Sequence, residues 1–255
     1  MNTGDLYLQT PSEIAKQLFA IFKPDDALTI LDIGSCEGLD SIRYSNMFPD
    51  ARVYAFEPLP ANIEKIEANL KKYAKPNITI IKEALSDQQG TATFFVSSGH
   101  PDNKPAVDEW DYGNKSSSLL APHETKNTHK WLEFNEEITV PTNTLENVCQ
   151  QHGIDTIDFI HMDVQGAELM VLSGAGKLLS EIKLIWLEVE AIELYKDQPV
   201  KVDVEEFMRL NDFQLIKDTV GRTSGDQLYV DKAFYKKIKA SMSLLSRINH
   251  FFFKK

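Results

Sequence analysis

The segment LTILDIGSCEGLDS, residues 28–41, decides the fold class. It begins with an apolar run, reaches an acid at Asp32, turns through Gly34 and Gly38, and continues into residues that favour a helix. A buried strand that leads through a glycine turn into a helix is the usual nucleotide-binding unit of an α/β protein. The segment therefore predicts a nucleotide-type ligand at the end of the first strand.

Apolar runs and helical periodicity alternate along most of the chain. Consecutive apolar residues predict buried parallel strands at 27–34, 52–58 and 77–85, and a helix is predicted at 60–73. The alternation resumes later in the predicted strands IDFIHMDV, KLIWLEVE, FQLIKDT and QLYVD. This order predicts an α/β fold with a parallel sheet and helices on both faces.

Caps and turns locate the ends of several elements. Thr10 as a cap, Pro11 at the first helical position and Glu13 in a capping box predict that the first helix begins at Thr10. The run GTATFFVSS, residues 90–98, follows a turn and is predicted to be an antiparallel strand. Asp203 is the predicted cap of a late helix.

We predict one domain over residues 1–231 with an inserted segment at 97–135. The segment is rich in Gly, Pro, Asn, Asp and Ser, and segments of this length are usually lids, binding loops or disordered. Trp110, Tyr112 and Trp131 within it either stack on a ligand or fix the segment to the domain.

Residues 232–255 differ from the rest because they contain six Lys, one Arg and no acid. The remaining residues carry a formal charge of −18, since −11 minus 7 is −18. Two interpretations stay open for this basic tail. It is a cationic surface helix against an acidic domain, or an amphipathic segment that contacts anionic lipid or an acidic partner.

Composition argues against several classes of protein. A formal charge of −11 over 255 residues is unfavourable for binding nucleic acid, because phosphate contacts need clustered Lys and Arg. Two cysteines, Cys36 and Cys149, form no disulfide framework, which favours a reducing compartment. The sequence shows neither a secretory signal nor an apolar run of about 18 residues. A soluble, cytoplasmic protein without a transmembrane segment is expected.

The glycine turn indicates which nucleotide is bound. A dinucleotide fingerprint needs a central glycine that lets the backbone touch a pyrophosphate, and Cys36 stands there. Asp32 and Glu37 would also repel two phosphates. These features disfavour a nucleotide-dependent oxidoreductase. They favour S-adenosylmethionine, which has no phosphate and carries ammonium and sulfonium charges.

Glu57 supports this interpretation, because it ends the second predicted strand. A carboxylate at that strand end can accept two hydrogen bonds from a ribose diol. The alternative is an ordinary solvated acid at a strand end.

Several separate motifs resemble the FkbM family of methyltransferases over about residues 28–220. They occur in the family's order: LDIGSCEGLDS, VYAFEPLPANIEKIEANL, EALSDQQGTATFF, SSSL, VPTNTLENV, IDFIHMDVQGAELMVLSGA and IKLIWLEVE. The resemblance implies a class I methyltransferase fold, Rossmann-like, with a seven-stranded sheet that is mostly parallel and has one antiparallel strand. It also implies S-adenosylmethionine as cofactor and O-methylation of a hydroxyl on a sugar, glycan or similar small molecule.

The resemblance implies cofactor contacts at nine positions, namely Asp32, Gly34, Ser35, Gly38, Glu57, Pro58, Ala84, Leu85 and Ser86. The first four would surround the methionine part, Glu57 would hold the ribose, and Ala84 and Leu85 would meet the adenine edge with Ser86 close by. Asp163 would face the methyl group and the acceptor. The family usually shows Asp-x-Glu-Gly there, whereas this chain has Gln165 in place of the Glu.

Candidates for the base that takes the hydroxyl proton lie at the carboxyl ends of predicted strands. They are Asp163, Glu188 and His161, with Glu190 nearby. Asp163 is alternatively a helix cap, and His161 is alternatively a core histidine with satisfied hydrogen bonds. Glu168 is explained by the helix dipole.

The sequence leaves two questions open, namely whether the site holds a metal ion and whether the protein is an enzyme. Asp163 and Glu188 are chemically suited to Mg²⁺, but their spacing does not require a metal. Besides the enzyme, a non-catalytic module that binds the cofactor and recruits a partner through the basic tail is a second hypothesis.

Overall fold

The computed structural model describes residues 3–104 and 111–240 of the chain. Its main sheet has seven strands in the order β3, β2, β1, β7, β8, β10, β9. Their bounds are β1 Thr29–Ile33, β2 Arg52–Phe56, β3 Ile78–Ile81, β7 Ile157–Met162, β8 Ile182–Glu190, β9 Phe213–Asp218 and β10 Ser224–Asp231. β10 runs antiparallel to both of its neighbours, and the other pairs of neighbouring strands are parallel. This confirms the expected mostly parallel sheet with one antiparallel strand.

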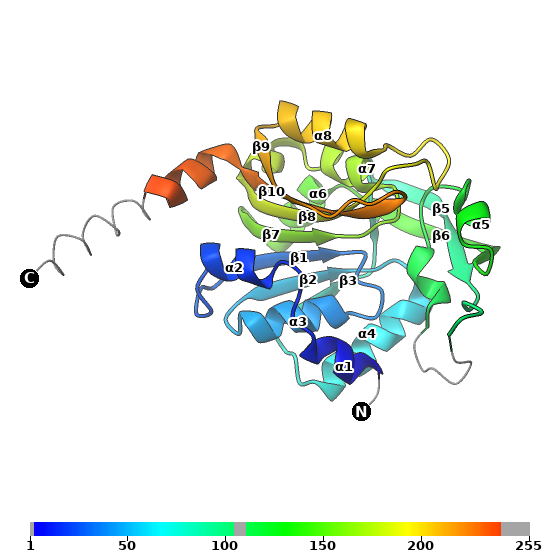
Figure 1. Ribbon diagram of the computed structural model, residues 1–255. Coiled ribbons are helices and arrows are strands. Elements are labelled where there is room, and N and C mark those ends of the chain that lie inside the picture. Colours follow the sequence, from blue (N-terminus) through cyan, green and yellow to red (C-terminus); the bar gives the residue numbers. More distant parts are fainter. Residues whose placement is uncertain (1–2, 105–110, 241–255) are drawn as a thin grey trace, which may run out of the picture.

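Helices cover both faces of this sheet (Figure 1). The α-helices are α1 Thr3–Gln9, α2 Ala15–Ile21, α3 Leu39–Met47, α4 Pro60–Lys72, α5 Thr125–Thr128, α6 Leu145–His152, α7 Glu168–Ser173 and α8 Lys201–Leu210. The 3₁₀ helices are η1 Gly113–Ser116 and η2 Gly176–Glu181. Side chains of α6, α7 and α8 pack against the strand residues on one face of the sheet, and side chains of α2 and α3 pack against those on the opposite face. All five residues of β1 are buried, because this central strand is covered on both faces.

A second sheet has three strands in the order β4, β6, β5. They are β4 Ala84–Leu85, β5 Gly90–Ser98 and β6 Glu133–Asn143. The predicted strand at 77–85 is therefore divided, and its end leaves the main sheet to pair with the end of β6. β5 is antiparallel to β6, as predicted for its sequence, but it lies outside the main sheet.

Two predicted helix starts are wrong. Thr10 does not cap a helix, because its hydroxyl donates to Leu6 O at the end of α1, and α2 begins only at Ala15. Asp203 lies inside the first turn of α8, where its carboxylate accepts a hydrogen bond from the backbone N–H of Val200. Asp203 is the third residue of α8, and its carboxylate gives a hydrogen-bond partner to a backbone N–H at the helix start that has none within the helix.

The predicted insertion at 97–135 contains the end of β5, η1, α5 and the start of β6. Trp110 lies outside the described residues. The rings of Tyr112 and Trp131 contact those of His100 and His129.

Residues 232–240 are helical and continue away from β10 (Figure 1). The ring of Phe234 stacks on that of Phe22 with 6.2 Å between centroids. The rest of the basic tail, 241–255, lies outside the described residues. Within the described part of the chain, no helix is long and apolar enough to cross a membrane.

Candidate active site

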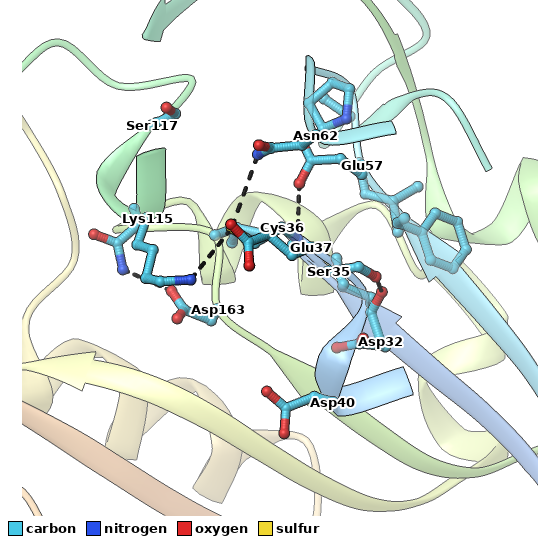
Figure 2. Close-up of a pocket in the computed structure, with 18 of the residues that line it drawn as sticks. Asp32, Ser35, Cys36, Glu37, Asp40, Glu57, Asn62, Lys115, Ser117 and Asp163 are labelled. Atoms are coloured by element: carbon cyan, nitrogen blue, oxygen red, sulfur yellow. Dashed lines mark hydrogen bonds between the residues drawn. The ribbon is translucent and has the colours of Figure 1, made fainter. Parts of the chain in front are cut away.

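A cavity opens at the carboxyl ends of β1, β2 and β7, where the glycine turn follows β1 (Figure 2). Nine predicted site residues line it: Asp32, Gly34, Ser35, Glu57, Pro58, Ala84, Leu85, His161 and Asp163. Gly38, Ser86 and Glu188 are not among the lining residues. The structure thus brings together residues from both halves of the chain.

The turn after β1 has little room for side chains. Gly34 has φ +85°, and a Cβ atom there would lie 1.9 Å from the carbonyl oxygen of Asp163. The loops after β1 and β7 therefore touch through their backbones, and only glycine fits. Gly38 has a packing role instead, because a Cβ there would lie 3.0 Å from Ile66 of α4.

Cys36 occupies the position of the missing central glycine with φ +51°. Its backbone N–H donates to Glu57 Oε2 at 2.9 Å. Its sulfur lies 3.8 Å from Lys115 Nζ and 3.9 Å from Asn62 Nδ2, and Figure 2 draws these contacts. The turn is thus tied to the end of β2, to α4 and to η1.

Asp32 is buried at the end of β1 and accepts two hydrogen bonds. Ser41 Oγ donates to its Oδ2 at 2.5 Å, and His161 Nδ1 lies 3.1 Å from its Oδ1. Burial lowers the pKa of His161, but the hydrogen bond to Asp32 and the nearby carboxylates outweigh it and raise this pKa to about 9. At neutral pH His161 is therefore an imidazolium ion, which cannot accept a proton.

Glu57 is buried, and both of its oxygens accept backbone hydrogen bonds. Cys36 N donates to Oε2 and Leu59 N to Oε1, each at 2.9 Å. Burial raises the pKa of Glu57 to about 7. Each carboxylate oxygen can still accept one more hydrogen bond, which is what a ribose diol would supply.

An apolar region of the cavity lies beside β4. Ala84 and Leu85 line it together with Pro58, Phe94 and Leu119. Ser86 points elsewhere, because its hydroxyl lies 3.1 Å from Asp87 Oδ1. Its predicted adenine contact is not supported, since the chain has turned to pair with β6 at this point.

Asp163 follows β7, and its backbone N–H donates to Ile33 O at 2.9 Å. It does not cap the next helix, because α7 begins at Glu168 with Ala167 as its N-cap. Glu168 Oε1 instead accepts hydrogen bonds from loop N–H groups, so its role goes beyond the predicted dipole effect. Asp163 is therefore available to the cavity that it lines.

Glu188 lies on β8 outside the cavity lining and is joined to Asp163 through one side chain. Gln165 Nε2 lies 2.6 Å from Asp163 Oδ1 and 2.5 Å from Glu188 Oε2. Burial and the charge of Asp163 raise the pKa of Glu188 well above its usual range. Burial raises the pKa of Glu190, also on β8, to about 7.

Sequence reasoning missed several lining residues. Tyr7 from α1 is one, and its hydroxyl donates to Asp40 Oδ2 at 2.6 Å. Arg43 pairs with Asp40 at 2.8 Å and stacks over the Tyr7 ring at 3.9 Å. The sequence of α1 shows no stripe of apolar residues at helical spacing and no motif, because none of the residues of this helix is buried.

The predicted insertion contributes Asn114, Lys115, Ser117 and Leu119 to the cavity. Figure 2 shows Lys115 and Ser117 across the cavity from Asp32. Tyr112 and Trp131 are not lining residues, so the structure favours their role in fixing the segment. Four residues of the run NKSSSLL, rather than Tyr112 or Trp131, therefore line the site.

The suggested Mg²⁺ ligands do not form an open site. The amide nitrogen of Gln165 already lies between Asp163 and Glu188. Among the residues described, no group of three His, Cys, Asp or Glu side chains is placed to hold a metal ion.

Comparisons with known proteins agree with the sequence motifs. A model described as the methyltransferase FkbM domain matches residues 32–215. The 2-O-methyltransferase NoeI of Sinorhizobium fredii is 30% identical over 217 residues, which are 85% of this chain and 84% of NoeI. The AMB antimetabolite synthetase AmbE of Pseudomonas aeruginosa is 30% identical over 184 residues, which are 66% of this chain and 9% of AmbE. The precorrin-6y C5,15-methyltransferase of Geobacter metallireducens superposes with a TM-score of 0.46 at 14% identity, covering 87% of this chain and 89% of that one.

The strand order and the glycine turn at the cavity define a Rossmann-like fold of the class I methyltransferase type, and the family match makes the chain a methyltransferase that depends on S-adenosylmethionine. The chain belongs to the FkbM family of methyltransferases. The resemblance found in the sequence motifs is thereby confirmed.

Proposed function

We propose that this chain transfers the methyl group of S-adenosylmethionine to a hydroxyl group of a sugar, glycan or similar small molecule. The family match and the similarity to a 2-O-methyltransferase support it. The observation that carries it is the position of Asp163, a carboxylate that lines the cavity directly beside the glycine turn. A hydroxyl acceptor needs such a group, because it must lose its proton as it attacks.

We assign the cofactor contacts to residues that line the cavity. Asp32, Gly34 and Ser35 would hold the methionine part, and Glu57 would accept hydrogen bonds from the ribose. The apolar region around Leu85 suits the adenine ring. When bound, S-adenosylmethionine supplies a methyl group on a sulfonium centre, and the C–S bond breaks as the new O–CH₃ bond forms.

We assign the proton to Asp163 rather than to His161. The hydroxyl proton passes to the Asp163 carboxylate, which lines the cavity. His161 is already protonated at neutral pH and serves as a fixed positive charge beside Asp32. Glu188 lies behind Gln165 and outside the cavity lining, which supports an indirect role.

The acceptor would enter from the side of the predicted insertion. Lys115 and Ser117 from that segment line the cavity and offer N–H and O–H donors suited to a hydroxylated ligand. Cytoplasmic location, the absence of nucleic-acid binding and lipid contact through residues 232–255 stay predictions.

Calorimetric titration with S-adenosylmethionine tests the cofactor site. We expect micromolar binding to the wild type and a loss of at least about tenfold in Glu57→Ala, which removes the predicted ribose acceptor. Glu64→Ala, an exposed glutamate on α4, is the matched control and should bind like the wild type. No binding to folded, cofactor-free protein would overturn the cofactor assignment.

Transfer from a labelled methyl donor to a panel of monosaccharides and glycan extracts tests the reaction. Labelled product with the wild type and at least about 100-fold less with Asp163→Asn would support the assignment of the base. Cofactor binding without any transfer across the panel would favour the non-catalytic module instead.

A further inference from the structure

Gln165 lies in the short loop between β7 and α7, with its backbone in the left-handed region at φ +56°. A residue other than glycine is strained in this conformation, because its Cβ lies close to the following carbonyl oxygen. The loop is held on both sides: Val164 N and Gly166 N donate to Glu168 Oε1 at 3.1 and 3.3 Å, and Ser118 Oγ donates to Gln165 O at 2.8 Å. The direction of the Gln165 side chain is therefore fixed by its surroundings.

The amide group of Gln165 has a partner on each side. One N–H points to Asp163 Oδ1 at 2.6 Å and the other to Glu188 Oε2 at 2.5 Å. The Tyr195 hydroxyl lies 2.8 Å from Gln165 Oε1. The Asp163 carboxylate can only accept, so its hydrogen bond fixes which end of the amide is nitrogen.

In the part of the chain that the structure describes, no Lys or Arg forms an ion pair with Asp163 or Glu188. The ionisable groups on the elements around the pair are His161, Glu168, Glu190, Tyr195 and Asp226. Lys115 lines the same cavity as Asp163. The positive charges near the pair are therefore those of His161 and Lys115, and neither is joined to Asp163 or Glu188 by a hydrogen bond in the described residues.

We propose that Gln165 is a positioning residue whose amide bridges Asp163 and the carboxyl group of Glu188, in a place that a cation could take, and that it holds Asp163 toward the cavity. This inference rests on the proposed function, in which Asp163 takes the acceptor proton. A neutral amide separates the carboxylates without contributing a full positive charge. Lys or Mg²⁺ in the same place would add a full positive charge that stabilises the ionised carboxylate of Asp163 and makes it a weaker base.

Substitution of Gln165 by glutamate tests the position without any acceptor. Gln165→Glu removes both N–H donors and creates three adjacent carboxylates, which suit a divalent cation. We expect calorimetry to show Mn²⁺ binding at least about tenfold tighter than in the wild type, with Mn²⁺ also raising the Tm. Gln151→Glu, at an exposed position on α6, makes the same change of charge and should gain no binding.

Two results of the Mn²⁺ titration would overturn the proposal. One is that Gln165→Glu binds Mn²⁺ no more tightly than Gln151→Glu. The other is that the wild type already binds Mn²⁺ as tightly as Gln165→Glu and loses this binding in Asp163→Asn. That result would show that the amide does not occupy the place of a cation.

Gln165→Met, which keeps the side-chain length without donors, tests the positioning role with the acceptor that the wild type methylates best. We expect kcat to fall at least about tenfold while the Kd for S-adenosylmethionine stays within about twofold. An unchanged kcat would refute the positioning role. Failure of the proposed function can be distinguished from failure of this inference. If the proposed function is wrong, the wild type itself binds no methyl donor or transfers no methyl group. The Mn²⁺ titration would still report on Gln165 in that case.

Discussion

Replacing His161 by glutamine should remove a pH-dependent part of the stability. In the folded protein, Asp32 and the nearby carboxylates raise the pKa of His161 to about 9, against about 6.5 for an unfolded histidine. The folded state then binds a proton more tightly than the unfolded state. This stabilisation is fully present below pH 6.5 and is lost as the pH rises through 9.

The size of the effect follows from that difference. About 2.5 pKa units at 1.36 kcal/mol each correspond to about 3 kcal/mol. The side chain of His161 is 16% exposed, so solvent screens its interaction with Asp32 only weakly. We therefore expect the free energy of unfolding of the wild type, relative to His161→Gln, to fall by about 3 kcal/mol between pH 6.5 and pH 9.5.

Urea unfolding at four pH values across this range measures the difference. Other groups titrate in the same window, but they do so in both proteins and cancel from the comparison. His123→Gln, at an exposed position, is the matched control and should show no such trend. A wild-type advantage that stays constant with pH would refute the reasoning. His161 would then be neutral in the folded state, and its role as a base would be open again.

Three further predictions concern the cofactor cavity. Gly34→Ala should lower the free energy of unfolding by about 2–4 kcal/mol in urea, because residue 34 has φ +85° and the new Cβ would lie 1.9 Å from Asp163 O. A loss below about 1 kcal/mol would contradict this close contact. Tyr7→Ala should weaken S-adenosylmethionine binding about tenfold in calorimetry, because Tyr7 lines the cavity, and it should also lower the Tm, because its hydroxyl donates to Asp40 and its ring stacks on Arg43. Equal affinity would show that Tyr7 does not reach the cofactor. S-adenosylmethionine binding should strengthen about tenfold from pH 6 to pH 8, because Glu57 has a pKa of about 7 and ionises over this range. The same pH dependence in Glu57→Gln would exclude Glu57 as its cause.

The parts of the fold that could be predicted from the sequence are those that local patterns determine. Consecutive apolar residues at 27–34 mark the central strand, because burial on both faces leaves no polar alternation. Gly34 marks a turn where two backbones meet. The separation of β3 from β4 had no local signal, since it depends on pairing with β6, whose partner residues lie about sixty positions later.

Much of the candidate site could not be predicted, because its contacts join distant residues. His161 and Asp32 pair across 129 positions, and this pairing together with the nearby carboxylates makes His161 cationic rather than a base. Gln165 was visible as a departure from the family pattern, but its two carboxylate partners were not. Tyr7 had no signal at all, because it lies on a short helix held by polar contacts.

The acids that line the cavity have three kinds of partner. Three of them have cationic partners, in the pairs Asp32–His161, Asp40–Arg43 and Glu37–Lys65. Glu57 is held by backbone N–H groups, and Asp163 and Glu83 are each held by a neutral amide. In the proposed reaction, Asp163 becomes neutral in the same step that removes the positive charge from the donor sulfur. Both charges vanish together, so the products leave no unpaired charge in a buried site, where such a charge would be costly. A further cation paired directly with Asp163 would break this balance, which is a physical reason for an amide at position 165.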